Sequence, residues 1–205
     1  MLVLKPWITT AALTLGVLTM APAYADKDAE ALVKRIGSEV IDAAKADKSI
    51  QAGDVKRVIT LVDAKVLPHV SFETMTRSAV GPQWKAATPE QRAKLQQEFK
   101  TLLTHVYSGA LAQIKDQTVE VTRSIPVPQS TQVVVQSEVR GRGEPIKLDY
   151  RLDKGDTGWK IIDVKVGPIW LVTSYRAQFA PIISSGGIDG LVAELLAMNK
   201  ALAKG

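Results

Sequence analysis

The sequence contains no cysteine and only two histidines among its 205 residues, and aromatic residues make up only 5% of it. Without cysteine, the chain has no disulfide, no thiolate metal ligand and no thiol nucleophile. The histidines, His69 and His105, are far apart in the sequence and neither belongs to an H-E-x-x-H spacing, so a metal site has no support. A chain that is 46% hydrophobic must therefore fold by burying apolar side chains.

The common motifs of catalysis are missing as well. Ser108 precedes Gly109 but does not stand in a G-x-S-x-G elbow, which argues against a serine hydrolase. No G-x-G-x-x-G or phosphate-binding loop is present. Asp163 is the remaining candidate general base, because a carboxylate among apolar neighbours can have a raised pKa. The alternative, an outward-facing or edge carboxylate, is the commoner role for such a residue.

The charge pattern does not point to a nucleic-acid partner. Lys and Arg number 26 and Asp and Glu 21, which gives a formal net charge of +5. Basic and acidic residues are interleaved, as in Lys34 and Arg35 with Glu39, and no basic stripe with aromatics between its members is present. We therefore expect no nucleic-acid binding.

The first 25 residues have the features of a signal peptide for export. Lys5 supplies a short positive region, residues 7–20 are apolar or small, and Ala23-Tyr24-Ala25 matches a signal-peptidase site. The apolar run is too short to favour a membrane span. We expect cleavage after Ala25 and a mature chain, residues 26–205, that folds as a single domain.

Helical periodicity dominates the first half of the chain. Helices are expected over residues 28–46, 55–66, 69–80 and 89–114. The longest is predicted to begin at Thr88, which can cap the helix while Gln91 completes a capping box. Its apolar side chains form a broad stripe that must be covered: Leu95, Phe99, Leu102, Leu103, Val106, Tyr107, Ala110, Leu111 and Ile114.

From Val119 the period of the apolar residues changes to two, which predicts strands. The expected strands cover residues 119–125, 133–139, 146–152 and 159–166, joined by short turns into an antiparallel meander with one apolar face. After a Gly167-Pro168 break, a helix carries Tyr175, and a further break at Gly186-Gly187 precedes a last helix. The predicted class is α+β, a curved antiparallel sheet of about four to five strands packed against several helices.

Periodicity alone does not distinguish a filled core from a cavity lined by the same residues. A family resemblance bears on that question. Four stretches of the chain carry it: FETMTRSAVGPQWKAATPEQRAKLQQEFKTLL, WKIIDV, SYRAQF and GGIDGLVAEL. Together they resemble the MlaC family, the periplasmic phospholipid-shuttle proteins also known as toluene-tolerance proteins. The resemblance covers nearly all of the mature chain, and the chain departs from the family pattern at residues 166–170, VGPIW, where the wall of a cavity would change shape.

The resemblance implies a nuclear-transport-factor-like cone with added helices, in which acyl chains lie in an apolar cavity between sheet and helices. It implies no enzymatic activity, no cofactor and no metal, with a phospholipid as cargo. It further implies a monomeric periplasmic carrier that shuttles glycerophospholipids between two transport complexes and so maintains outer-membrane lipid asymmetry. These are an inner-membrane ABC transporter complex with a lipid-binding ring and an outer-membrane lipoprotein–porin complex.

On this basis we expect the lipid-binding residues to come from the sheet face and the helices opposite it. They are Phe72, Met75, Leu103, Tyr107, Leu148, Tyr150, Ile161, Val164, Tyr175 and Phe179, with Phe72 and Met75 near the mouth. Arg140 and Arg176 are candidates for the phosphate of the headgroup, because a guanidinium group presents a fork of donors; ordinary surface ion pairs are the alternative. Two rival functions stay open. One is a cone-fold enzyme that acts on a hydrophobic small molecule with Asp163 as general base, and the other is a scaffold or chaperone for unfolded proteins.

Overall fold

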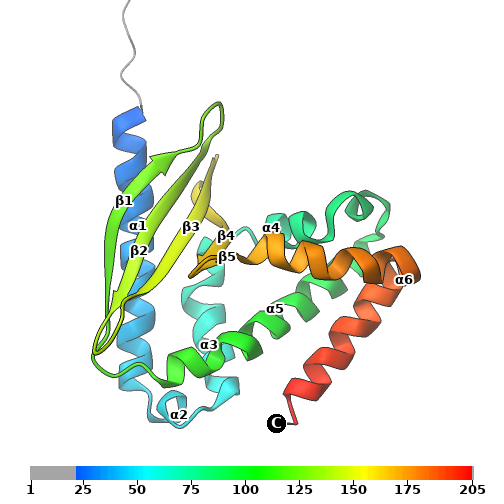
Figure 1. Cartoon of the computed structure of the whole chain (residues 1–205), viewed down its shortest axis with the longest axis horizontal. Coiled ribbons are helices and arrows are strands. Elements are labelled where there is room, and N and C mark those ends of the chain that lie inside the picture. Colours follow the sequence, from blue (N-terminus) through cyan, green and yellow to red (C-terminus); the bar gives the residue numbers. More distant parts are fainter. Residues whose placement is uncertain (1–21, 205) are drawn as a thin grey trace, which may run out of the picture.

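The computed structural model describes residues 22–204, and residues 1–21 of the expected export signal lie outside this range. The described chain forms six α-helices, two 3-10 helices and five strands (Figure 1). In chain order they are α1 (Pro22–Ala46), α2 (Lys48–Gln51), α3 (Val55–Lys65), η1 (Leu67–His69), α4 (Phe72–Val80), η2 (Gly81–Ala86), α5 (Pro89–Ala112), β1 (Thr118–Pro126), β2 (Gln132–Arg140), β3 (Ile146–Gly155), β4 (Gly158–Val166), β5 (Ile169–Trp170) and α6 (Leu171–Leu202).

The strands form one antiparallel sheet in the order β1-β2-β3-β4-β5, so each strand pairs with the next along the chain. The alternating sequence produces this arrangement because one side of each strand is buried, as Val133 and Val135 are in β2. The predicted α+β class and the antiparallel meander are confirmed.

A bulge in β4 changes which of its side chains share a face. Arg151 of β3 pairs with Asp163, but the next residue, Leu152, pairs with Ile161, so Ile162 is an extra residue in β4. Residues three apart normally point to opposite faces of a strand, but an extra residue between them brings both to the same face. Ile161 and Val164 therefore lie on the same side of the sheet, and Asp163 lies on the other.

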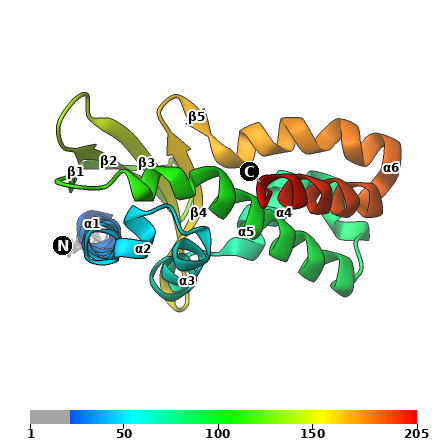
Figure 2. The same ribbon diagram turned by 90° about the horizontal axis from the view of Figure 1, so that it is seen from below.

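The helices are arranged around one side of the sheet (Figures 1 and 2). Helix α1 packs along β1 and β2, and α3 contacts both α1 and α5. Helix α6 packs against α4 and α5, and together these three helices extend beyond the sheet (Figure 1). Because α5 contacts both α3 and α6, it connects the two groups of helices.

Two local predictions about helix ends are confirmed. Thr88 and Gln91 form the complete capping box at the start of α5. The expected break at Gly186-Gly187 is a kink within α6, where Gly187 has φ +64°. By length and composition alone, α6 is apolar enough to cross a membrane, but its buried side chains belong to a packed core with α4 and α5.

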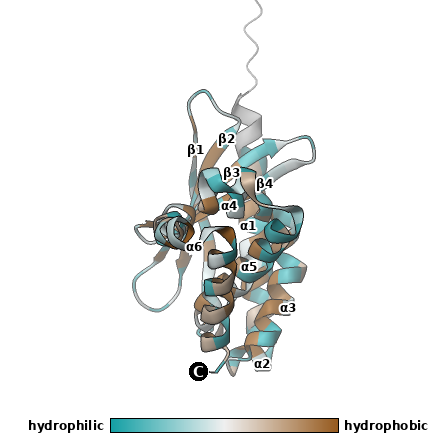
Figure 3. Cartoon of the chain, turned by 90° about the vertical axis from the view of Figure 1, so that its right-hand side faces the viewer, coloured by the Kyte–Doolittle hydropathy of each residue, from teal (hydrophilic) through white to brown (hydrophobic). Residues whose placement is uncertain are grey.

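Most of the buried hydrophobic residues fall into three clusters. The helices show both hydrophobic and hydrophilic faces (Figure 3). The first cluster joins α4, α5 and α6 around Phe99. The second joins α1 to the sheet around Val33 and Val135, and the third joins α1, α2 and α3 around Ile50. A core divided in this way leaves room for a cavity between its parts.

Three details of the predicted helices were wrong. The segment from His69 is not one helix, because Leu67–His69 form a 3-10 turn and α4 begins only at Phe72. The short helix α2 was not predicted. Val106, expected on the buried stripe of α5, is 47% exposed, because α5 turns its Leu103, Tyr107 and Leu111 side inward at that point.

Candidate functional site

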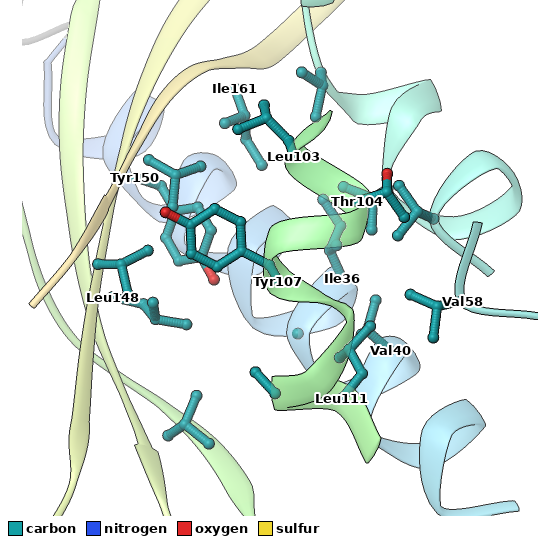
Figure 4. Close-up of a pocket in the computed structure, with 18 of the residues that line it drawn as sticks. Ile36, Val40, Val58, Leu103, Thr104, Tyr107, Leu111, Leu148, Tyr150 and Ile161 are labelled. Atoms are coloured by element: carbon teal, nitrogen blue, oxygen red, sulfur yellow. The ribbon is translucent and has the colours of Figure 1, made fainter. Parts of the chain in front are cut away.

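A cavity of about 500 Å³ lies between the sheet and helices α1, α3 and α5 (Figure 4). Its wall includes members of all three hydrophobic clusters, such as Leu171 from the first, Ile36 from the second and Val58 from the third. Aliphatic side chains dominate the lining. The size and the apolar lining are typical of sites that bind small apolar ligands.

Eight of the ten residues predicted to contact a ligand lie in this wall. Helix α5 and strands β3 and β4 supply most of them, and α4 supplies the other two. The eight are Phe72, Met75, Leu103, Tyr107, Leu148, Tyr150, Ile161 and Val164. The β4 bulge is what allows Ile161 and Val164 to line the same cavity.

The other two predicted lining residues, Tyr175 and Phe179, lie elsewhere, in the first hydrophobic cluster. Their rings pack on Phe99, with centroid separations of 4.9 Å and 5.4 Å respectively. Tyr175 is 8% exposed and Phe179 2% exposed, and neither belongs to the cavity wall. These aromatic side chains fix α6 to α5, and their expected place in the cavity was wrong.

Two tyrosines place hydroxyl groups within the otherwise apolar wall. Tyr107 from α5 and Tyr150 from β3 both project into the cavity (Figure 4). Burial raises the pKa of Tyr150 to about 12, and burial also raises the pKa of Tyr107. Both phenols are therefore uncharged at neutral pH and can serve as hydrogen-bond donors to a ligand.

Sequence reasoning missed the side of the wall formed by α1 and α3. Ile36, Val40, Val58 and Val62 line the cavity, although their spacing had predicted only packing between helices. The wall also contains polar residues that were not expected there: Lys100, Thr104, Ser108, Gln113 and Gln117. The helical spacing of α5 could have predicted Lys100 and Thr104 as lining residues, because Lys100 lies one turn from Leu103 and Thr104 lies one turn from Tyr107.

Asp163 does not line the cavity. Its carboxylate oxygen Oδ1 accepts hydrogen bonds from the backbone nitrogens of Val164, at 2.9 Å, and Val172, at 3.0 Å. Burial raises the pKa of Asp163, while these two hydrogen bonds and the Arg151 charge oppose that rise. Because Val172 is in the first turn of α6, Asp163 serves as a cap supplied from a neighbouring strand.

The two arginines predicted near a headgroup also lie outside the cavity wall. Arg140, at the end of β2, forms ion pairs with Glu120 at 3.0 Å and Glu138 at 2.9 Å. Arg176, on α6, is exposed, and its guanidinium lies against Gly81. Arg140 thus fits the surface ion-pair alternative, and the structure does not bring the two arginines to the cavity.

Within residues 22–204, no three His, Cys, Asp or Glu side chains gather in a group that could hold a metal ion. Among the described residues, no Asp or Glu lines the cavity, so its wall supplies no carboxylate that could act as a base. The fold and the cavity together define an α+β protein that encloses a space for an apolar ligand between an antiparallel sheet and helices.

The chain belongs to the MlaC family, whose model matches residues 34–197. It is similar to the toluene tolerance protein Ttg2D of Pseudomonas putida, with 24% identity over 178 residues that cover 83% of this chain and 82% of that protein. It is also similar to a solved structure, the phospholipid-binding protein of Ralstonia solanacearum in complex with a phospholipid. That match has 41% identity and a TM-score of 0.82, and covers 85% of this chain and 98% of the other.

Proposed function

We propose that this protein binds a glycerophospholipid, with the acyl chains in the cavity between the sheet and helices α1, α3 and α5. The observation that carries the proposal is the apolar cavity of about 500 Å³. The similar Ralstonia solanacearum protein is described as phospholipid-binding, which supports the same ligand here. Each methylene removed from water contributes about 0.8 kcal/mol, so the transfer of an acyl chain from water into this space is strongly favourable.

The bound lipid is cargo, and the protein is a carrier rather than an enzyme. Both a bilayer and this cavity are apolar, so moving an acyl chain from one to the other involves a small net free energy. Small net transfer energy is what a carrier needs, since it must release what it takes. Asp163, the residue on which an enzymatic alternative depended, is engaged with the backbone of α6.

The proposed setting is the periplasm. After export and cleavage behind Ala25, the monomeric carrier exchanges phospholipids with an inner-membrane ABC transporter complex and an outer-membrane lipoprotein–porin complex. This exchange contributes to outer-membrane lipid asymmetry. The A-x-A site of the leader and membership of the MlaC family support this setting.

Native mass spectrometry of protein purified from the periplasmic fraction tests the ligand. We expect the mass of the chain from Asp26 plus one two-chain phospholipid, and organic extraction should release that lipid. Protein that carries no lipid, and takes none up from phospholipid vesicles, would contradict the proposal. Transfer of a labelled phospholipid between vesicles that carry the two membrane complexes then tests the carrier role.

A further inference from the structure

Lys100 holds a distinctive position in the cavity wall. Among the described residues that line the cavity, Lys100 alone carries a charge. Its amine Nζ lies 3.1 Å from Asp63 Oδ1, and this ion pair bridges α5 to α3. The Lys100 side chain is 22% exposed and that of Asp63 is 45% exposed. The aliphatic stem of Lys100 thus follows the apolar wall while its ammonium group reaches toward water.

A second, more open hollow of about 360 Å³ adjoins the cavity at this point. Leu67, Phe72 and Lys100 line both spaces, so the two adjoin there. The remaining wall of the second hollow comes from α5 and includes the amides of Gln96 and Gln97. An amphipathic ligand would find an apolar space on one side of Lys100 and a polar, open space on the other.

We propose that Lys100 binds the phosphate group of the bound lipid, with the headgroup in the hollow beside Gln96 and Gln97. This assignment rests on the proposed function. A glycerophospholipid carries its phosphodiester anion at the junction between acyl chains and headgroup, and Lys100 stands at the corresponding junction between the two spaces. An ammonium group is a compact charge with three donors, so it can bind a phosphate without reading the substituent beyond it.

The ion pair with Asp63 is compatible with this role, because Asp63 is well exposed and an exposed ion pair is weak. When a lipid enters, the phosphate replaces the Asp63 carboxylate as partner of Lys100, and Asp63 returns to water. The two residues therefore act in opposition, with Lys100 attracting the phosphate and Asp63 competing with it.

The opposite effects expected of Lys100 and Asp63 on phosphate binding can be tested by substitution. Delipidated protein is equilibrated with mixed micelles that contain equal amounts of dioleoyl phosphatidylglycerol and dioleoylglycerol, and native mass spectrometry gives the ratio of the two retained lipids. We expect Lys100→Gln to lower the ratio of phospholipid to diacylglycerol about tenfold, the loss of one charge-assisted contact. Lys100→Arg should keep the ratio, and Asp63→Asn should keep or raise it.

Lys65→Gln is the matched control, since Lys65 also bridges two helices through a 3.1 Å ion pair, with Glu39, but does not line the cavity. The ratio of phospholipid to diacylglycerol retained by Lys65→Gln should equal that of the wild type. Equal losses in Lys100→Gln and Asp63→Asn would show that only the helix bridge matters and would overturn the assignment, as would an unchanged ratio in Lys100→Gln. Wild-type protein that retains neither lipid would overturn the proposed function itself.

Inorganic phosphate distinguishes a lipid headgroup from a free anion. Empty protein is titrated with inorganic phosphate, and its thermal unfolding is followed in the wild type and in Lys100→Gln. We expect no stabilisation that depends on Lys100. Stabilisation of the wild type alone would identify a site for free phosphate and would overturn the assignment to lipid.

Discussion

The carboxylate of Asp163 in β4 accepts a hydrogen bond from the backbone nitrogen of Val172, 3.0 Å away in the first turn of α6. Trp170, at the N-cap position of α6, makes no side-chain capping bond, so Asp163 supplies from a neighbouring strand the acceptor that a helix start requires. The same oxygen accepts from Val164. The WKIIDV motif thus joins the sheet to the helix that follows it.

Asp163→Ala should destabilise the fold without removing the ligand. The backbone N–H groups of Val164 and Val172 would lose their acceptor, and we expect the free energy of unfolding to fall by about 1–3 kcal/mol. Asp163→Asn keeps an acceptor oxygen, so its free energy of unfolding should fall by less. Urea unfolding followed by circular dichroism measures both changes, and native mass spectrometry should find lipid retained in each folded variant. An Ala variant as stable as the wild type would contradict the capping role.

A charge placed in the cavity should expel the ligand. Leu148 is half-buried in the wall, and Leu148→Glu would set a carboxylate against an acyl chain, which is costly without a partner. We expect lipid retained after purification to fall at least about tenfold, as measured by native mass spectrometry. Ile161 is less suitable because it is 2% exposed and part of a packed cluster, so Glu at that position would threaten folding.

The matched control for this charge is Val106→Glu. Val106 is 47% exposed, lies one residue from Tyr107 on α5 and is not part of the cavity wall. Its substitution should leave lipid retention unchanged. Equal retention in Leu148→Glu and Val106→Glu, with both proteins folded, would mean that the ligand does not lie along Leu148.

Phe179 should matter for stability and Tyr107 for the ligand. Phe179→Ala removes a ring that packs on Phe99, 5.4 Å between centroids, and we expect a loss of about 3–5 kcal/mol in the free energy of unfolding. At temperatures where this variant stays folded, it should retain lipid. Tyr107→Ala, in the cavity wall, should lose less stability and retain less lipid. Thermal unfolding and native mass spectrometry on both variants check this contrast, and lipid loss confined to Phe179→Ala would reverse the two assignments.

The sequence predicts much of this fold because local patterns determine the elements. The capping box at Thr88, the alternation in β2 and the Gly187 break are all local signals, and each has its expected structural counterpart. The start of α4 is harder to place, because residues 67–71 carry a 3-10 turn and a bridge from Val70 to Ile161 that depend on the distant strand β4.

The division between core and cavity is not a local property. Phe99 and Leu103 are one helical turn apart on α5, yet Phe99 is 1% exposed in a filled cluster and Leu103 lines the cavity. Periodicity assigns both to the same apolar stripe, and only the positions of α1, α3 and α6 separate them. Tyr175 and Phe179 were misplaced for this reason. The bulge at Ile162 is likewise set by the pairing of β3 with β4.

Close contact between α1 and β1 sets one side of the cavity, and Gly37 makes it possible. A Cβ added at Gly37 would lie 2.9 Å from Cγ2 and 3.0 Å from Cγ1 of Val119, a short, branched side chain with little freedom to move. Overpacking of this kind costs about 1–3 kcal/mol, while Ala in place of Gly favours a helix by about 1 kcal/mol. We expect Gly37→Ala to lower the free energy of unfolding by about 1 kcal/mol, measured by urea denaturation.

Gly109→Ala is the control, because Gly109 is an exposed residue of α5 with no neighbouring atom within 4 Å of an added Cβ. It should stabilise the protein by about 0.5–1 kcal/mol. Adding Val119→Ala to Gly37→Ala should cost less than Val119→Ala costs in the wild type, because the smaller side chain removes the clash. This difference is the coupling measured by a double-mutant cycle. If Gly37→Ala stabilised the chain as much as Gly109→Ala, α1 would have room to move away from β1, and Gly37 would not control their separation.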